Sequence, residues 1–81
     1  MPRYFFHVAD GQEFSDLQGT QLPDLAAARK EALRFAGRLL ADAKPDLWDG
    51  EEWTMRVTDG DNLTLFTLMF VATNAAAVKG K

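Results

Sequence analysis

The chain has 81 residues, enough for one small domain, and carries nine Lys and Arg against twelve Asp and Glu, a net charge of −3 at pH 7. It has no Cys and a single His, which excludes disulfides, thiolate metal sites, thiol catalysis and a multi-histidine metal site within one chain. No apolar run approaches the roughly 18 residues of a membrane span, and the N-terminus lacks the pattern of a signal peptide, so we expect a soluble, cytoplasmic protein with no membrane partner.

The first third of the chain predicts two strands. Residues 3–8 are rich in aromatic and β-branched side chains and stop at the turn dipeptide Asp10-Gly11, which predicts a strand followed by a tight reversal. In residues 14–22 the apolar side chains keep no clean period, and Gly19 interrupts them. This second segment is therefore predicted to be a short, irregular edge strand.

A helix is predicted from Asp24 to near Ala43. Asp24 can cap its first turn, and apolar residues then recur at three- and four-residue spacing, namely Leu25, Ala28, Ala32, Phe35, Ala36 and Leu39. Leu33 and Leu40 lie beside this arc and widen the apolar face. Pro45 cannot continue the helix and disfavours a helical residue before it, which sets the end of the helix.

The last third predicts a hairpin. Residues 53–58 alternate apolar and polar side chains, as a half-buried strand does, and residues 59–62 supply the turn. Residues 63–72 form a long strand that is apolar on both faces, with Leu63, Leu65, Met69 and Val71 on one face and Phe66, Leu68 and Phe70 on the other. We expect one domain over residues 1–73 and a flexible tail over residues 74–81.

The predicted order is strand, strand, helix, strand, strand, which indicates an α+β fold: a small antiparallel-rich sheet with one helix packed on one face. One helix covers one face only, whereas the first and last strands carry apolar side chains on both. We therefore expect an apolar patch on the helix-free face, and such a patch usually marks an interface. It predicts a homodimer, with these interface candidates: Phe5, His7, Leu65, Met69 and, from a polar loop, Trp48.

Several short segments resemble known families. Met1-Pro2-Arg3-Tyr4-Phe5-Phe6, Asp10-Gly11, Asp16, Gly19, Leu22-Pro23-Asp24, Ala28-Arg29 and Glu31-Ala32 are similar to a family of short uncharacterised bacterial proteins classed as a domain of unknown function. This resemblance spans about residues 1–72 and implies no particular activity. A second, shorter similarity, in Asp16-Leu17-Gln18-Gly19 and Glu31-Ala32, is to HicB-type antitoxin domains.

No segment of the sequence assembles a catalytic or ligand-binding motif. His7 is the only histidine, and one His without a nucleophile beside it is an incomplete catalytic apparatus, so we predict a partly buried place at a sheet surface or interface. Residues 59–62 lack the later ligand positions of a calcium loop. The glycines are scattered singly, which excludes a phosphate-cradling loop. We therefore predict no enzyme activity, no cofactor and no bound metal.

Lys30, Arg34 and Arg38 follow one another at four-residue steps on the polar face of the helix, where they form a basic stripe. Aligned cations favour phosphate binding, but the acidic remainder of the chain repels a polyanion, so we place an acidic protein partner ahead of nucleic acid. The predicted function is a small non-enzymatic interaction module that self-associates, with a regulatory or adaptor role. The alternative is a nucleic-acid-associated or antitoxin-like protein that uses the basic stripe.

Overall fold

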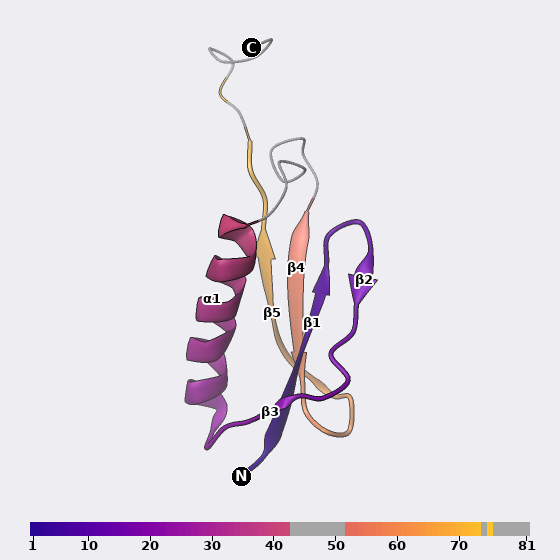
Figure 1. The fold of residues 1–81 in the computed structure, drawn as a ribbon, viewed down its shortest axis with the longest axis vertical. Helices are drawn as coiled ribbons and strands as arrows, with labels where there is room; N and C mark the ends of the chain where they lie inside the picture. Colours follow the sequence, from indigo (N-terminus) through magenta and orange to yellow (C-terminus); the bar gives the residue numbers. More distant parts are fainter. Residues whose placement is uncertain (43–51, 74, 76–81) are drawn as a thin grey trace.

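The computed structural model describes residues 1–42, 52–73 and 75. Its elements are β1 (Arg3–Ala9), β2 (Glu13–Phe14), β3 (Thr20–Gln21), α1 (Leu25–Ala41), β4 (Trp53–Thr58) and β5 (Thr64–Phe70) (Figure 1). One helix on an antiparallel sheet confirms the predicted α+β class. Trp48 and the predicted tail, apart from residue 75, lie outside the described residues.

The strands form one antiparallel sheet in the order β2-β1-β4-β5, and β3 pairs with the same edge of β1 as β2 does. Across the sheet Phe6 lies opposite Val57, and Val57 lies opposite Phe66. Because side chains alternate between faces, this register fixes which residues of all three long strands point the same way. Between Val57 and Thr58 the register with β5 shifts, which leaves Leu65 as an extra residue.

The second predicted strand is divided into two. β2 pairs with the end of β1 and β3 with its beginning, each over two residues, and the chain leaves the sheet between them. There the carboxylate of Asp16 accepts a hydrogen bond from the backbone N–H of Phe6 at 3.2 Å. In a continuous edge strand, a backbone carbonyl oxygen would accept the hydrogen bond from this N–H group of β1. Here the side chain of Asp16 accepts it instead. The sequence predicted an irregular strand but not this break.

The helix forms as its sequence pattern predicts. Asp24 caps it, since its Oδ1 accepts a hydrogen bond from the N–H of Ala27 at 2.9 Å. Three alanines, Ala28, Ala32 and Ala36, are fully buried against the sheet. The helix ends at Ala41, two residues before the predicted end.

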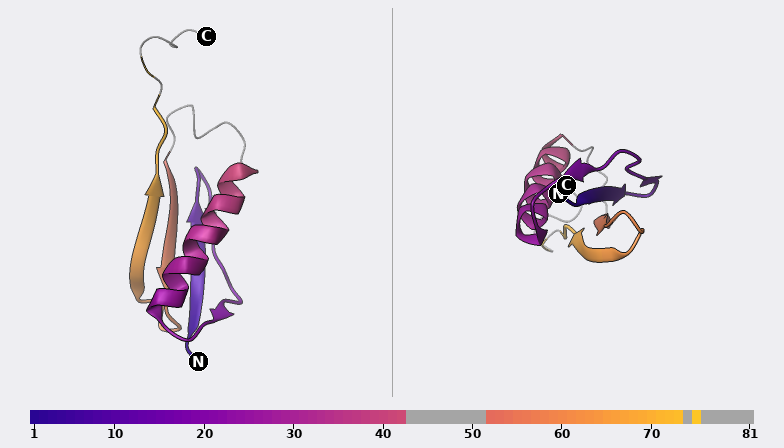
Figure 2. Two further views of the ribbon diagram at one scale, coloured as in Figure 1. Left: turned by 90° about the vertical axis from the view of Figure 1, so that its left-hand side faces the viewer. Right: turned by 90° about the horizontal axis from the view of Figure 1, so that it is seen from below.

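The core lies between the helix and the middle of the sheet. The residues of β4 that face the helix are all buried: Trp53, Met55 and Val57. The corresponding residues of β5 are only half-buried: Phe66, Leu68 and Phe70. Figure 2 shows the reason in its left-hand view, in which α1 crosses the sheet obliquely, from the lower part of β5 toward β1.

The dimensions of helices and strands explain this incomplete cover. A helix is about 10 Å wide, whereas adjacent strands lie about 4.8 Å apart, so one helix covers roughly two strands. Among the residues that the structure describes, the helix face of this sheet therefore keeps two partly open strips, one along β5 and one along β1 and β2. No helix in the described part of the chain has the length and apolar character needed to cross a bilayer.

Candidate functional site

The helix-free face of the sheet is more polar than the sequence analysis expected. The register places on it Phe5 and His7 from β1, Thr54, Arg56 and Thr58 from β4, and Thr67 and Met69 from β5. The central strand β4 thus contributes no apolar side chain to this face. The apolar residues of β1 and β5 are separated by this polar strand and do not form one continuous patch.

Asp16 organises a loop, Ser15–Gly19, at the edge of β1. Its carboxylate accepts hydrogen bonds from the backbone N–H groups of Phe6 at 3.2 Å and of Gln18 and Gly19 at 3.0 Å each. Burial acts to raise the pKa of Asp16, but the three backbone hydrogen bonds outweigh it, so this pKa is lowered. The loop therefore depends on an ionised Asp16.

His7 joins this loop to β4. The backbone N–H of Asp16 donates to His7 Nδ1 at 3.1 Å, and His7 Nε2 lies 3.0 Å from Thr58 Oγ1. Since Nδ1 accepts, the ring proton belongs on Nε2, which donates to the threonine hydroxyl. Thr58 is 1% exposed. Both ring nitrogens are thus engaged within the chain, which fits the partly buried place predicted for His7.

Gly19 closes the loop over Phe5. Its φ is +73°, and a Cβ at this position would lie 2.8 Å from Arg3 Cγ and 2.8 Å from Phe5 Cε2. Arg3 Nη1 also donates to the carbonyl oxygen of Gln18 at 2.8 Å. Only glycine fits this backbone shape and this close approach. Phe5 and His7, both predicted interface residues, are therefore packed against the protein's own loop.

Several large apolar side chains are exposed along the outer edge of β5. β5 ends the sheet, and in the part of the chain that the structure describes no strand pairs with its outer side. Large apolar side chains are exposed along or beside it: Leu63, Met69 and Val71, with Met69 at 62%. Leu65 sits at the register shift and packs against the core, so it does not follow the alternation that the sequence predicts. Met69 is thus the exposed member among the predicted interface residues that the structure describes.

One flank of α1 continues this apolar edge. At 100° per residue, Leu33 and Leu40 lie on one side of the alanine stripe, and Glu31, Phe35 and Arg38 lie on the other. The second group faces β1 and β2, so the Leu33–Leu40 flank faces the β5 side of the sheet. Leu33 is 59% exposed, and Leu40 is half-buried against the core. The β5 edge and this flank together are called the β5 surface below.

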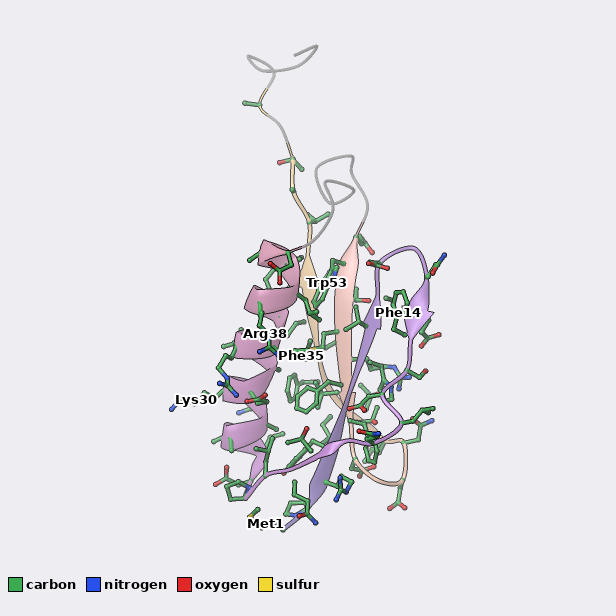
Figure 3. The ribbon with its side chains drawn as sticks, in the orientation of Figure 1. Met1, Phe14, Lys30, Phe35, Arg38 and Trp53 are labelled. Carbon is green, nitrogen blue, oxygen red and sulfur yellow. The ribbon has the colours of Figure 1, made fainter. Side chains whose placement is uncertain are left out.

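The basic stripe is not a row of three equivalent cations. Arg34 Nη2 forms an ion pair with Glu31 Oε1 at 2.8 Å, and the guanidinium of Arg38 lies 6.0 Å from the ring centre of Phe35. Figure 3 shows Lys30 projecting away from the sheet, whereas Arg38 lies beside Phe35. The three side chains therefore differ in direction and in partner. Within the described ranges, no three His, Asp or Glu side chains gather in a way that could hold a metal ion.

Comparison with known proteins places this chain in a family. Searches of curated proteins and of solved structures gave no match. A family model described as a domain of unknown function, DUF6894, matches residues 3–71, which include every strand and the helix. Because this model spans most of the sequence, the chain belongs to the DUF6894 family.

Proposed function

We propose that the chain is a small non-enzymatic interaction module that forms a homodimer through the β5 surface, with a regulatory or adaptor role. The observation that carries the proposal is the edge strand itself. β5 has seven residues, none of them charged and none of them Pro or Gly. Soluble proteins usually protect an edge strand with charges, prolines, bulges or a covering segment. Among the described residues β5 shows one of these features, the irregularity at Leu65, and residues 66–70 beyond it form a regular apolar edge that can pair with another strand.

The partly covered core beside β5 supports the same proposal. Phe66, Leu68 and Phe70 point to the helix side, where α1 leaves them half-buried. If two copies pair their β5 strands antiparallel about a two-fold axis perpendicular to the sheet, the sheet becomes continuous and both helices lie on the same face. The Leu33–Leu40 flanks of the two helices then lie on either side of the axis, above the half-buried side chains of β5. One symmetric contact would thus pair the free backbone N–H and C=O groups of β5 and cover the partly open strip beside it.

The proposal changes the predicted interface but keeps its chemistry. The sequence predicts a dimer contact on the helix-free face, which β4 makes polar and the Ser15–Gly19 loop partly occupies. Met69 belongs to both versions of the interface, because it is exposed on β5 at the edge. Phe5 and His7 do not belong to the β5 surface.

Light scattering coupled to gel filtration tests the proposal. The wild-type chain is expected to have twice its 9.0 kDa mass at micromolar concentration. Met69→Lys and Leu33→Lys each place a charge on the β5 surface and should give monomers that remain folded, because both side chains are largely exposed. Leu17→Lys is the matched control: Leu17 is 88% exposed in the loop at the opposite edge of the sheet, and this variant should stay dimeric.

Two results would contradict the proposal. A wild-type chain that is monomeric at high micromolar concentration would show that the β5 surface does not drive association. A dimer that both Met69→Lys and Leu33→Lys leave intact would show that the contact lies elsewhere.

A further inference from the structure

A cleft of about 1090 Å³ lies on the other side of α1, between the helix and the β1–β2 hairpin. Phe6 and Val8 of β1 line it, Phe35 and Leu39 contribute from the helix, and Phe14 of β2 lies beyond them. In Figure 3, Phe35 projects from α1 toward the sheet, and Phe14 stands on the hairpin at the far side of β1. This hairpin cleft is the second of the two strips that the single helix leaves partly open.

Phe14 faces the hairpin cleft but is not covered by the helix. It pairs with Val8 across the hairpin, so both side chains point to the helix side of the sheet. Phe14 is nevertheless 54% exposed, because α1 packs on β4 and, through the contact of Phe35 with Phe6, on β1. The hairpin thus presents an aromatic ring to a hollow that the described part of the chain does not fill. Exposed aromatic side chains beside a hollow are typical anchor points for a protein partner.

The charges around the hairpin cleft are strongly unequal. Its lining includes five acidic residues, Asp10, Asp16, Glu31, Asp42 and Glu52, and one basic residue, Arg38. Asp16 is engaged by backbone N–H groups, and Glu31 pairs with Arg34. Asp10, Asp42 and Glu52 are exposed, and none of the ion pairs among the described residues includes them.

These three carboxylates share one end of the hairpin cleft. Asp10 follows β1, Asp42 caps the C-terminus of α1, Glu52 precedes β4, and all three line the hairpin cleft. In Figure 1 the end of β1, the end of α1 and the start of β4 all lie toward the upper end of the sheet. The C-terminus of a helix adds negative potential of its own. The hairpin cleft therefore combines an apolar floor with an acidic end.

We propose that the hairpin cleft binds an apolar segment of a partner protein that carries Lys or Arg at one end. Apolar side chains of the segment would pack against Phe14, Phe35 and Val8, and its cations would lie near Asp10, Asp42 and Glu52. This site lies on the opposite flank of α1 from the β5 surface. It goes beyond the proposed homodimer and does not depend on it.

Fluorescence anisotropy with synthetic peptides tests the site. The probe is a labelled peptide of about 12 residues, three helical turns, with Leu at three- and four-residue spacing and Arg at one end. Its matched probe has Glu in place of each Arg. We expect the cationic peptide to bind at least roughly tenfold more tightly at low salt, and the difference to shrink as salt is added.

Two variants and two controls locate the binding. Phe14→Ser should weaken binding of the cationic peptide roughly tenfold through loss of the apolar anchor. Asp42→Lys should weaken it and reduce its salt dependence, and it should not harm the helix, because a cation is favourable at a helix C-terminus. The matched controls are Leu17→Ser and Asp61→Lys, which alter exposed residues outside the hairpin cleft and should bind as wild type does.

The same measurement on Met69→Lys separates this site from dimerisation, since a monomer with an intact hairpin cleft should bind the cationic peptide unchanged. The proposal is overturned if the cationic peptide does not bind at millimolar concentration, or if both peptides bind equally. Binding that Phe14→Ser and Asp42→Lys both leave unchanged would also overturn it, because the peptide would then occupy another surface.

Discussion

Replacement of Asp16 tests the role of the loop at the edge of β1. In the wild type its carboxylate accepts three backbone hydrogen bonds, from Phe6, Gln18 and Gly19. A hydrogen bond to a charged group contributes roughly 1.5 to 3 kcal/mol, and the Asp16 side chain is partly exposed. For Asp16→Ala we therefore expect a loss of about 2 to 4 kcal/mol in the free energy of unfolding, a large fraction of the stability of a domain this small.

A second substitution at the same position separates the hydrogen bond with Phe6 from those with Gln18 and Gly19. Asp16→Asn retains one oxygen, which can still accept from Gln18 and Gly19, but its NH₂ group would face the N–H of Phe6. We expect Asp16→Asn to lose about half as much as Asp16→Ala. Asp61→Asn, at an exposed residue of the β4–β5 turn, is the control and should change stability by less than about 0.5 kcal/mol.

Urea denaturation followed by circular dichroism measures these differences, and its pH dependence gives a second check. The folded state lowers the pKa of Asp16 below its ordinary value of 3.8, so the unfolded chain takes up this proton first as pH falls. The stability that Asp16 contributes is then fully present above about pH 5 and is lost as pH falls through the lowered pKa. The difference between wild type and Asp16→Ala should therefore be constant from pH 7 to pH 5 and shrink below about pH 4.

Three results would refute this account of Asp16. Asp16→Ala within about 0.5 kcal/mol of wild type would show that the loop does not need the carboxylate. Equal losses in Asp16→Ala and Asp16→Asn would show that the contact with Phe6 accounts for the whole effect. If the stability difference between wild type and Asp16→Ala grew as pH falls, folding would raise the pKa of Asp16 instead of lowering it.

Two further predictions concern glycine positions and the basic stripe. Gly19→Ala should destabilise the domain by more than about 1 kcal/mol in thermal unfolding, because its φ is +73° and a Cβ would clash with Arg3 and Phe5. Gly37→Ala, where a Cβ meets nothing within 4 Å, should instead stabilise α1 by up to about 1 kcal/mol, and the opposite ranking would contradict the loop geometry. For the stripe, we expect no binding to duplex or single-stranded DNA tighter than about 10⁻⁵ M at physiological salt, since Arg34 is paired with Glu31 and the chain is acidic overall. Submicromolar binding in a filter assay, abolished by Lys30→Glu, would instead favour the nucleic-acid alternative.

Local sequence patterns were enough to predict the helix and the strand β4. The Asp24 cap and the three- and four-residue spacing of Ala28, Ala32 and Ala36 predicted the helix and its buried face, and the structure confirms both. The alternation in residues 53–58 predicted β4 and its buried side. These features are legible in sequence because the interacting residues lie within a few positions of one another.

Other features of the fold depend on contacts between residues that are far apart in the chain. The break between β2 and β3 depends on Asp16 reaching Phe6, and His7 meets Thr58 from a position 51 residues away in the chain. The place of Leu65 depends on a register shift between two strands, which no single strand encodes.

The exposure of the β5 surface and of the hairpin cleft follows from the angle at which α1 crosses the sheet. That angle is set by how closely the small residues on the buried stripe of the helix let it approach β4, and by the packing of Phe35 against Phe6. Periodicity shows which side of a helix is buried, but not which strands it covers. Which strands the helix covers depends on contacts between elements that are far apart in the sequence. Here those contacts leave one strip of apolar surface on each side of α1.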